Sequence, residues 1–82
     1  MKLDDSVQQF RMRFGKVVRK YRESKKLSQE ELADICELHR TYISDIERGI
    51  KAVSINSLLK IAMALEIPPH VLIHEAEDTL KD

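Results

Sequence analysis

The sequence is poor in several kinds of residue, and each shortage excludes a class of protein. Its 82 residues include two glycines, two prolines, one cysteine and no tryptophan. So little turn-forming material disfavours a β-barrel or β-sandwich, and the single Cys36 cannot form an internal disulfide or a cysteine-based metal site. No apolar run approaches the roughly 20 residues that cross a membrane, and no secretion signal follows Met1. We therefore expect a soluble cytoplasmic protein with one small domain, residues 1–82.

The charge of the chain is balanced overall but distributed unevenly. Fourteen basic and fourteen acidic residues give a formal net charge of zero. Residues 10–26, however, hold eight basic residues and one acidic residue, whereas residues 66–82 hold five acidic residues and one lysine. Binding responds to the local field, so the basic segment is a candidate surface for a polyanion. A solvated helix face explains the same charges equally well.

The spacing of apolar residues predicts helices and no strands, so the expected fold class is all-α. Apolar residues repeat every three or four positions through most of the chain, as on one face of a helix. The five expected helices cover about residues 6–24, 29–36, 40–48, 55–65 and a last segment from the prolines to about Leu80. The residues expected to face the core include Leu32, Ala33, Ile35 and Cys36 in the second helix and Ile55, Leu58, Leu59, Ala62 and Leu65 in the fourth.

Start and stop signals fix several of these boundaries. Ser28 followed by Glu31 predicts a capping box at the start of the second helix, and Ser54 gives a similar start to the fourth. Gly49 can adopt the left-handed conformation that ends the third helix. The prolines after Ile67 end the fourth helix and can open the fifth.

The second and third helices are separated by only three residues, 37–39. Such a short connection forces two helices to cross steeply, as in a helix-turn-helix, here over about residues 28–48. Three segments, SQEELA (28–33), YISDIERG (42–49) and LLKIAMAL (58–65), resemble the phage-repressor-like (XRE) helix-turn-helix family. The segment HRTYISDIERG (39–49) is closer still to controller proteins of restriction-modification systems.

The resemblance implies a compact five-helix lambda-repressor-like domain that binds double-stranded DNA and regulates transcription. It departs from the family pattern at two positions. Glu37 occupies a turn position often held by glycine, so either the turn is strained or its geometry differs. His39 is a weaker N-cap for the third helix than Asp or Ser.

In this motif the third helix enters the major groove, and its first residues meet base edges. We therefore expect Arg40, Thr41 and Ser44 to read bases, with Arg40 donating to guanine. The residues expected to contact the DNA backbone are Gln29, Tyr42, Arg48, Lys51 and Arg19. Each has a structural alternative: Arg40 as a solvated charge, Tyr42 as a packing residue and Ser44 as a small spacer.

Other polar residues are expected to be structural. Glu47 is expected to form an ion pair with a nearby basic side chain, and Arg19 is one candidate for that partner. His70 and His74 have a spacing that can bind zinc, but no third ligand is defined, so we predict no metal and no cofactor. Cys36 is expected to be a buried apolar residue. No arrangement of a nucleophile and a base appears, so we expect no enzymatic activity.

A single reading helix makes too few contacts for tight, specific binding, so a homodimer on a two-fold symmetric operator is expected. The predicted dimer interface comprises Leu58, Ile67, Val71, Leu72 and Ile73. Alternatively, these residues close the core of the monomer. RNA polymerase is a further partner if the regulator activates transcription. The alternatives to specific regulation are an antitoxin or other protein-interaction module, and nucleic-acid binding without sequence preference through the basic first helix.

Overall fold

A computed structural model describes residues 2–78, and these form five α-helices without a strand among them. The helices are α1 (Leu3–Ser24), α2 (Gln29–Cys36), α3 (Arg40–Glu47), α4 (Ile55–Leu65) and α5 (Pro69–Asp78). The all-α prediction is confirmed, and the predicted starts of α2, α3 and α4 match the observed ones. Helix α1 begins three residues before the predicted start at residue 6. The predicted end of the last helix near Leu80 lies outside the described residues.

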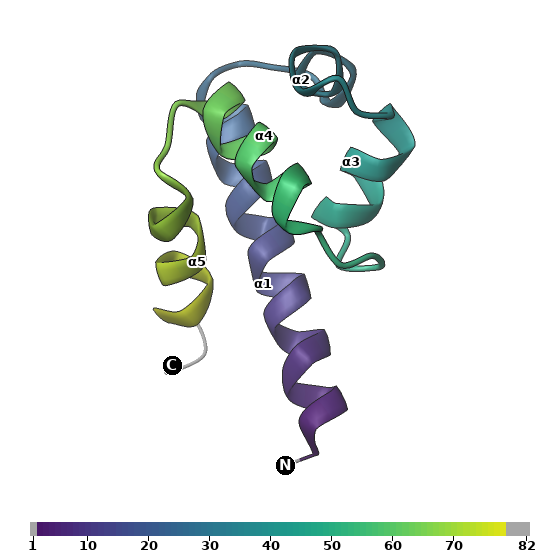
Figure 1. Cartoon of the computed structure of the whole chain (residues 1–82), viewed down its shortest axis with the longest axis vertical. Helices are drawn as coiled ribbons and strands as arrows, with labels where there is room; N and C mark the ends of the chain where they lie inside the picture. Colours follow the sequence, from purple (N-terminus) through teal and green to yellow (C-terminus); the bar gives the residue numbers. More distant parts are fainter. Residues whose placement is uncertain (1, 79–82) are drawn as a thin grey trace.

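Helix α1 is the longest helix, and it runs along the long axis of the molecule (Figure 1). Its C-terminal half packs between α3 on one side and α5 on the other, while α4 lies between α2 and α5. Its first turns extend beyond the other helices, so that the N-terminal end of the chain projects from the body. No helix within residues 2–78 is long and apolar enough to cross a membrane.

Serine caps begin two of the short helices, as predicted. The Ser28 hydroxyl accepts a hydrogen bond from the Glu31 amide at 3.0 Å, and the Glu31 carboxylate accepts one from the Ser28 amide at 2.8 Å. The Ser54 hydroxyl accepts from the Ser57 amide at 3.0 Å. These side chains satisfy amide groups that have no partner within the helix. His39 precedes α3 without forming such a side-chain cap.

The turns after α2 and α4 are left-handed although neither contains glycine. Glu37 has φ 58° and Glu66 has φ 59°. The Leu38 amide closes the first turn by donating to the Ala33 carbonyl at 2.9 Å. The helix-turn-helix turn therefore keeps the geometry usual for glycine and bears the strain of a side chain there. Gly49, with φ 75°, ends α3 in the left-handed conformation that the sequence predicts.

A single apolar core lies where the five helices meet. Its fully buried large side chains are Val18, Leu32, Ile43, Ile46, Ile61, Leu65 and Leu72. Helices α1 and α3 are in close contact at Gly15, where an added Cβ would lie 2.3 Å from the Ile46 carbonyl oxygen. A larger residue at Gly15 would hold the two helices apart, because no side chain can approach a backbone oxygen that closely.

Three predictions of burial in α2 and α4 were wrong. Ile55 and Leu59 were expected in the buried stripe of α4, yet their exposed fractions are 72% and 45%. Ile35 was expected to face inward from α2 and is 56% exposed. An apolar residue can follow helical spacing and still lie on the outer face, because spacing alone does not say which apolar stripe meets the core.

Candidate nucleic-acid interface

Helix α3 is amphipathic, with one face in the core and the opposite face exposed. Ile43 and Ile46 are buried. Arg40 and Thr41 are exposed at the start of the helix, and Ser44 follows one turn later, half-buried. Residues separated by three or four positions share a helix face, so these polar side chains form one edge. The structure thus brings together the three residues predicted to read bases.

Buried charges hold α3 against α1. The Arg22 guanidinium donates from Nε to Glu47 Oε2 at 2.7 Å and from Nη2 to Glu47 Oε1 at 3.0 Å. Its Nη1 donates to the Leu27 carbonyl at 2.7 Å. Only 10% of the Arg22 side chain and 3% of the Glu47 side chain are exposed. The hydrogen bonds to Glu47 raise the pKa of Arg22 above its ordinary value, so the guanidinium is charged throughout the working range of a protein.

This pair corrects one predicted contact. Arg19 was a candidate partner for Glu47, but Arg22 occupies that position, and Arg19 pairs with Glu23 at 3.2 Å on the surface. The two arginines are three residues apart, which rotates them by about 60° around the helix axis. That rotation turns Arg22 toward α3 and leaves 64% of the Arg19 side chain exposed.

The same pair positions Gln29 at the start of α2. Gln29 Nε2 donates to Glu47 Oε1 at 3.1 Å. The carboxylate at the end of α3 thus connects the last turn of α1 with the start of α2. Gln29 is the first residue of α2, where unpaired amide groups carry a partial positive charge. Its side chain is therefore held beside a helix end of the kind that binds phosphate.

Tyr42 joins α3 to the loop before α4. Its hydroxyl donates to the Ala52 carbonyl at 3.4 Å and accepts from the Ser54 amide at 3.3 Å. Burial raises the pKa of Tyr42, but hydrogen bonds with Ser57 and Ser54 outweigh it and lower the pKa below its ordinary value. The ring is half-buried. Tyr42 therefore has a structural role, whether or not it also contacts DNA.

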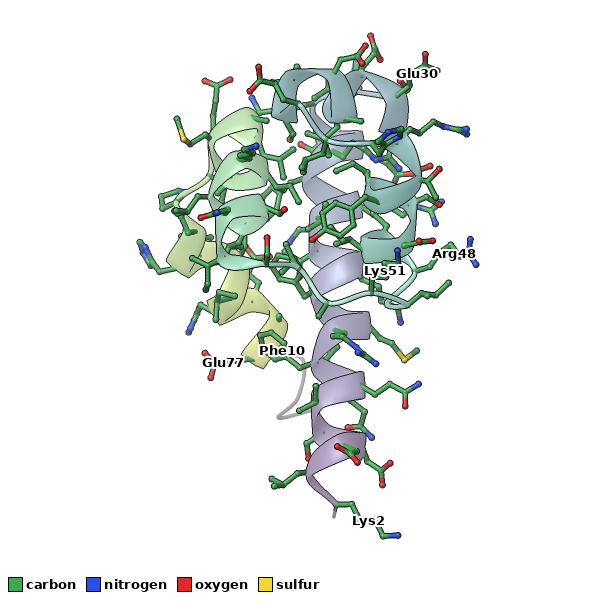
Figure 2. The ribbon with its side chains drawn as sticks, turned by 45° about the vertical axis from the view of Figure 1, so that its right-hand side comes forward. Lys2, Phe10, Glu30, Arg48, Lys51 and Glu77 are labelled. Carbon is green, nitrogen blue, oxygen red and sulfur yellow. The ribbon has the colours of Figure 1, made fainter. Side chains whose placement is uncertain are left out.

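Two further cations lie at the end of α3. Arg48 caps the helix and Lys51 follows in the loop, and both are exposed. Figure 2 shows their side chains projecting on the same side of the molecule. Lys51 Nζ lies 4.0 Å from the Asp45 carboxylate, a contact too long and too exposed to hold it firmly. Both cations can therefore reach toward an external anion.

The residues predicted for the dimer interface differ in accessibility. Leu58, Ile67, Val71 and Ile73 are half-buried. Leu72 is fully buried in the core, so it offers no surface to a second copy. The structure therefore supports the alternative interpretation for Leu72, in which this residue closes the core of the monomer.

Sequence reasoning missed a more exposed apolar surface on α4. Ile55, Leu59 and Met63, named here the α4 stripe, have exposed fractions of 72%, 45% and 78%. Ile35 of α2 lies beside Met63 in the same shallow hollow. The signal was present as apolar residues at i, i+4 and i+8 in the predicted helix, but Ile55 and Leu59 were assigned to the core and Met63 was assigned to neither core nor interface.

The histidines and the cysteine add no metal site to this surface. Within residues 2–78 no three side chains of His, Cys, Asp or Glu are grouped so as to hold a metal ion. Cys36 is buried, and burial raises the pKa of its thiol. A buried, protonated thiol of this kind packs as a small apolar residue.

Comparison with known proteins agrees with this geometry. Residues 18–72 match the family described as Helix-turn-helix, so the chain belongs to that family. Control protein C.BamHI of Bacillus amyloliquefaciens is 53% identical over 64 residues, which are 77% of this chain and 79% of that protein.

Solved structures give the same result. The restriction-modification controller protein C.AhdI from Aeromonas hydrophila has a TM-score of 0.74 at 44% identity, over 76% of this chain and 94% of that chain. SinR, the master regulator for biofilm formation, was solved in complex with DNA; it has a TM-score of 0.71 at 33% identity, over 73% of this chain and 97% of that chain. The resemblance to controller proteins stated above is confirmed.

Proposed function

We propose that this protein is a sequence-specific, DNA-binding transcriptional regulator of the restriction-modification controller type, acting as a homodimer on a two-fold symmetric operator. The observation that carries the proposal is the exposed polar edge of α3, formed by Arg40, Thr41 and Ser44 on a helix whose opposite face is buried. Its similarity to control proteins and to a DNA-bound regulator supports the same role. The protein acts by binding and not by catalysis.

Base readout falls to the start of α3. Arginine donates two hydrogen bonds to guanine O6 and N7 in the major groove, and Arg40 is the first residue of the helix. Thr41 offers a hydroxyl to a base or a methyl group to thymine. Ser44 lies one turn further along the same edge and can bond to a base or a phosphate.

The phosphate contacts surround this edge. Gln29 is fixed by Glu47 at the start of α2, where the helix dipole favours an anion. Arg48 and Lys51 supply charge at the other end of α3, and Tyr42 and Arg19 complete the predicted set. Because the Arg22–Glu47 pair ties α1, α2 and α3 together, the two sets of contacts keep a fixed relation to each other.

We place the dimer interface on the α4 stripe together with Leu58, Ile67, Val71 and Ile73, and we omit Leu72. Three exposed apolar side chains on successive turns of one helix cost solvation free energy in the monomer, and burial against a second copy removes that cost. A two-fold axis there would set two α3 helices about 34 Å apart, one turn of DNA.

The experiment that tests this proposal is selection of bound sequences from a random duplex pool. A regulator of this kind selects two copies of a half-site in inverted orientation, separated by about one helical turn. Equal recovery of all sequences, with affinity falling steeply as salt rises, would instead support binding by the basic segment without sequence preference.

The mass of the protein in solution separates the dimer from the alternative of a protein-interaction module. Leu59→Asp places a charge in the α4 stripe and should convert a dimer into a folded monomer, whereas Ser24→Asp, which adds the same charge at the exposed end of α1, should leave the dimer intact. A monomeric wild-type protein that binds no duplex would favour an antitoxin or adaptor. Contact with RNA polymerase and action in the cytoplasm remain predictions.

A further inference from the structure

The projecting end of α1 carries an apolar face that is exposed at Leu3 and Val7 and meets the body of the protein at Phe10, which packs against the core. Leu3 and Val7 have exposed fractions of 84% and 55%, and Phe10 is half-buried. These residues, named here the α1 stripe, continue the helix face that farther along enters the core at Phe14. Figure 2 shows that α1 is clear of the other helices below Phe10, down to Lys2. Because Leu3, Val7 and Phe10 follow helical spacing, they form one continuous apolar strip and not scattered exposed residues.

An apolar cleft lies where the α1 stripe meets the body of the protein. The cleft has a volume of about 160 Å³, and its walls are mainly apolar. Its lining residues are Phe10, Arg11, Phe14, Lys51, Ala52 and Val53. Arg11 Nε is shielded from solvent and has no hydrogen-bond partner among the described residues. The cleft therefore combines a mainly apolar lining with two cations, Arg11 and Lys51.

The start of α1 has the complementary character. Asp4 and Asp5 lie in its first turn, fully on the surface, beside the exposed Leu3. Asp4 and Arg11 are seven residues apart, so they lie on the same flank of the helix, offset by about 20°. One α1 thus carries an acidic residue at its start and a basic residue two turns later, along the same side of one apolar stripe.

We propose that this stripe is a second self-association surface, on which two copies of the chain pack their α1 ends antiparallel. In that arrangement Leu3 of the second copy covers Phe10 at the cleft, and its Asp4 faces Arg11. The contact repeats itself by two-fold symmetry, since each helix supplies both the acidic end and the cleft. Self-pairing is favoured over a different partner because the chain itself holds both complementary halves.

The contact is small, and its strength should reflect that. From Leu3 to Phe14 the helix rises about 16 Å, so the interface involves about three turns from each copy. Such a patch falls below the area of a stable dimer interface, and we expect association that depends on protein concentration. The α1 end lies away from α4 in Figure 1, so this contact would link dimers instead of forming them.

The test is the mass of the purified protein by sedimentation equilibrium over a wide range of concentration. The wild type should show a species of twice the mass of its basic unit at high concentration. Val7→Asp should weaken that step by about tenfold or more, because it buries a charge in the stripe. Gln9→Asp is the matched control: it adds the same charge two residues away, about 160° around the helix from Val7, and should leave the step unchanged.

A charge exchange tests the antiparallel direction. Asp4→Arg should weaken the step, and adding Arg11→Asp in the same chain should restore it, because each contact then regains opposite charges. Helix content and thermal unfolding check that the double variant remains folded. No concentration-dependent step in the wild type, equal effects of Val7→Asp and Gln9→Asp, or a folded double variant without rescue would each overturn the proposal.

The same measurement in the Leu59→Asp background keeps this proposal separate from the α4 dimer. If both surfaces are used, Leu59→Asp should halve the basic unit and still show the Val7-dependent step. If only Leu59→Asp fails to lower the mass of the basic unit, the α4 dimer is contradicted. If only Val7→Asp fails to weaken the concentration-dependent step, the α1 contact is contradicted.

Discussion

Helix α1 forms an ion pair on each of its two sides, and the two pairs differ in almost every property. On the α3 side, Arg22 and Glu47 form a bidentate pair that is almost fully buried. On the α5 side, Lys20 and Tyr21 both donate to Glu75, with 60% of the Lys20 side chain exposed. A buried ion pair holds its two helices in one arrangement, because separating the two groups leaves a buried charge without a partner. The groups of an exposed pair can be solvated by water instead, so separating them costs little free energy. The rigid side is the one that carries the polar edge of α3.

The largest expected effect comes from breaking the buried pair. Glu47→Ala leaves Arg22 charged and buried, so it should lower the free energy of unfolding by about 3–5 kcal/mol. Chemical denaturation followed by circular dichroism measures this. The double variant Arg22→Met with Glu47→Leu should recover much of the loss, because two apolar side chains replace the charges. Equal stability of wild type and Glu47→Ala would contradict the role of the pair.

The close approach of α1 and α3 should be nearly as sensitive. Gly15→Ala places a Cβ against the Ile46 carbonyl and should cost about 1–3 kcal/mol, because the backbone must shift to accept it. Thermal unfolding measures the change. Ser24→Ala, at the exposed end of α1, is the control and should have little effect.

The polar edge of α3 should affect binding without affecting stability. Arg40→Ala should weaken binding to the selected operator by about 1–3 kcal/mol and relax the preference at one base position. Stability should change by under about 0.5 kcal/mol, since Arg40 is exposed. Lys16→Ala removes an exposed cation from the outer face of α1 and is the matched control. A similar loss for both variants on every sequence would indicate binding by charge alone.

The exposed pair should have a small effect that depends on pH. Hydrogen bonds from Lys20 and Tyr21 hold the pKa of Glu75 below its ordinary value. A carboxyl with a lowered pKa stabilises the fold above its unfolded pKa and loses that contribution as the pH falls through its folded pKa. Glu75→Gln should therefore cost under about 1 kcal/mol at neutral pH and less in acid. A larger loss in acid than at pH 7 would reverse the assigned sign.

The smallest expected effect is a gain. Glu37 holds a left-handed conformation in the turn between α2 and α3, so Glu37→Gly should raise the free energy of unfolding by up to about 1 kcal/mol. Differential scanning calorimetry measures the shift. Glu23→Gly, in the helical part of α1, should lower stability instead, because glycine is unfavourable inside a helix.

Local signals predicted the elements well, and they failed where one helix had to be oriented against another. Ser28 and Ser54 defined the starts of α2 and α4, because a cap acts on amide groups within the next three residues. Arg22 and Arg19 could not be separated as partners of Glu47, since both are basic and less than one turn apart. Ile55 and Leu59 were assigned to the core because apolar spacing marks a helix face and not its neighbour.

The sequence by itself determined the five helices, the helix-turn-helix and the polar residues at the start of α3, since these depend on periodicity, caps and short connections. The tertiary structure alone decided that Arg22 meets Glu47, that Leu72 is enclosed, and that the α4 and α1 stripes remain outside. Those outcomes depend on the rotation of each helix about its axis, which packing of the whole core sets and no local pattern encodes.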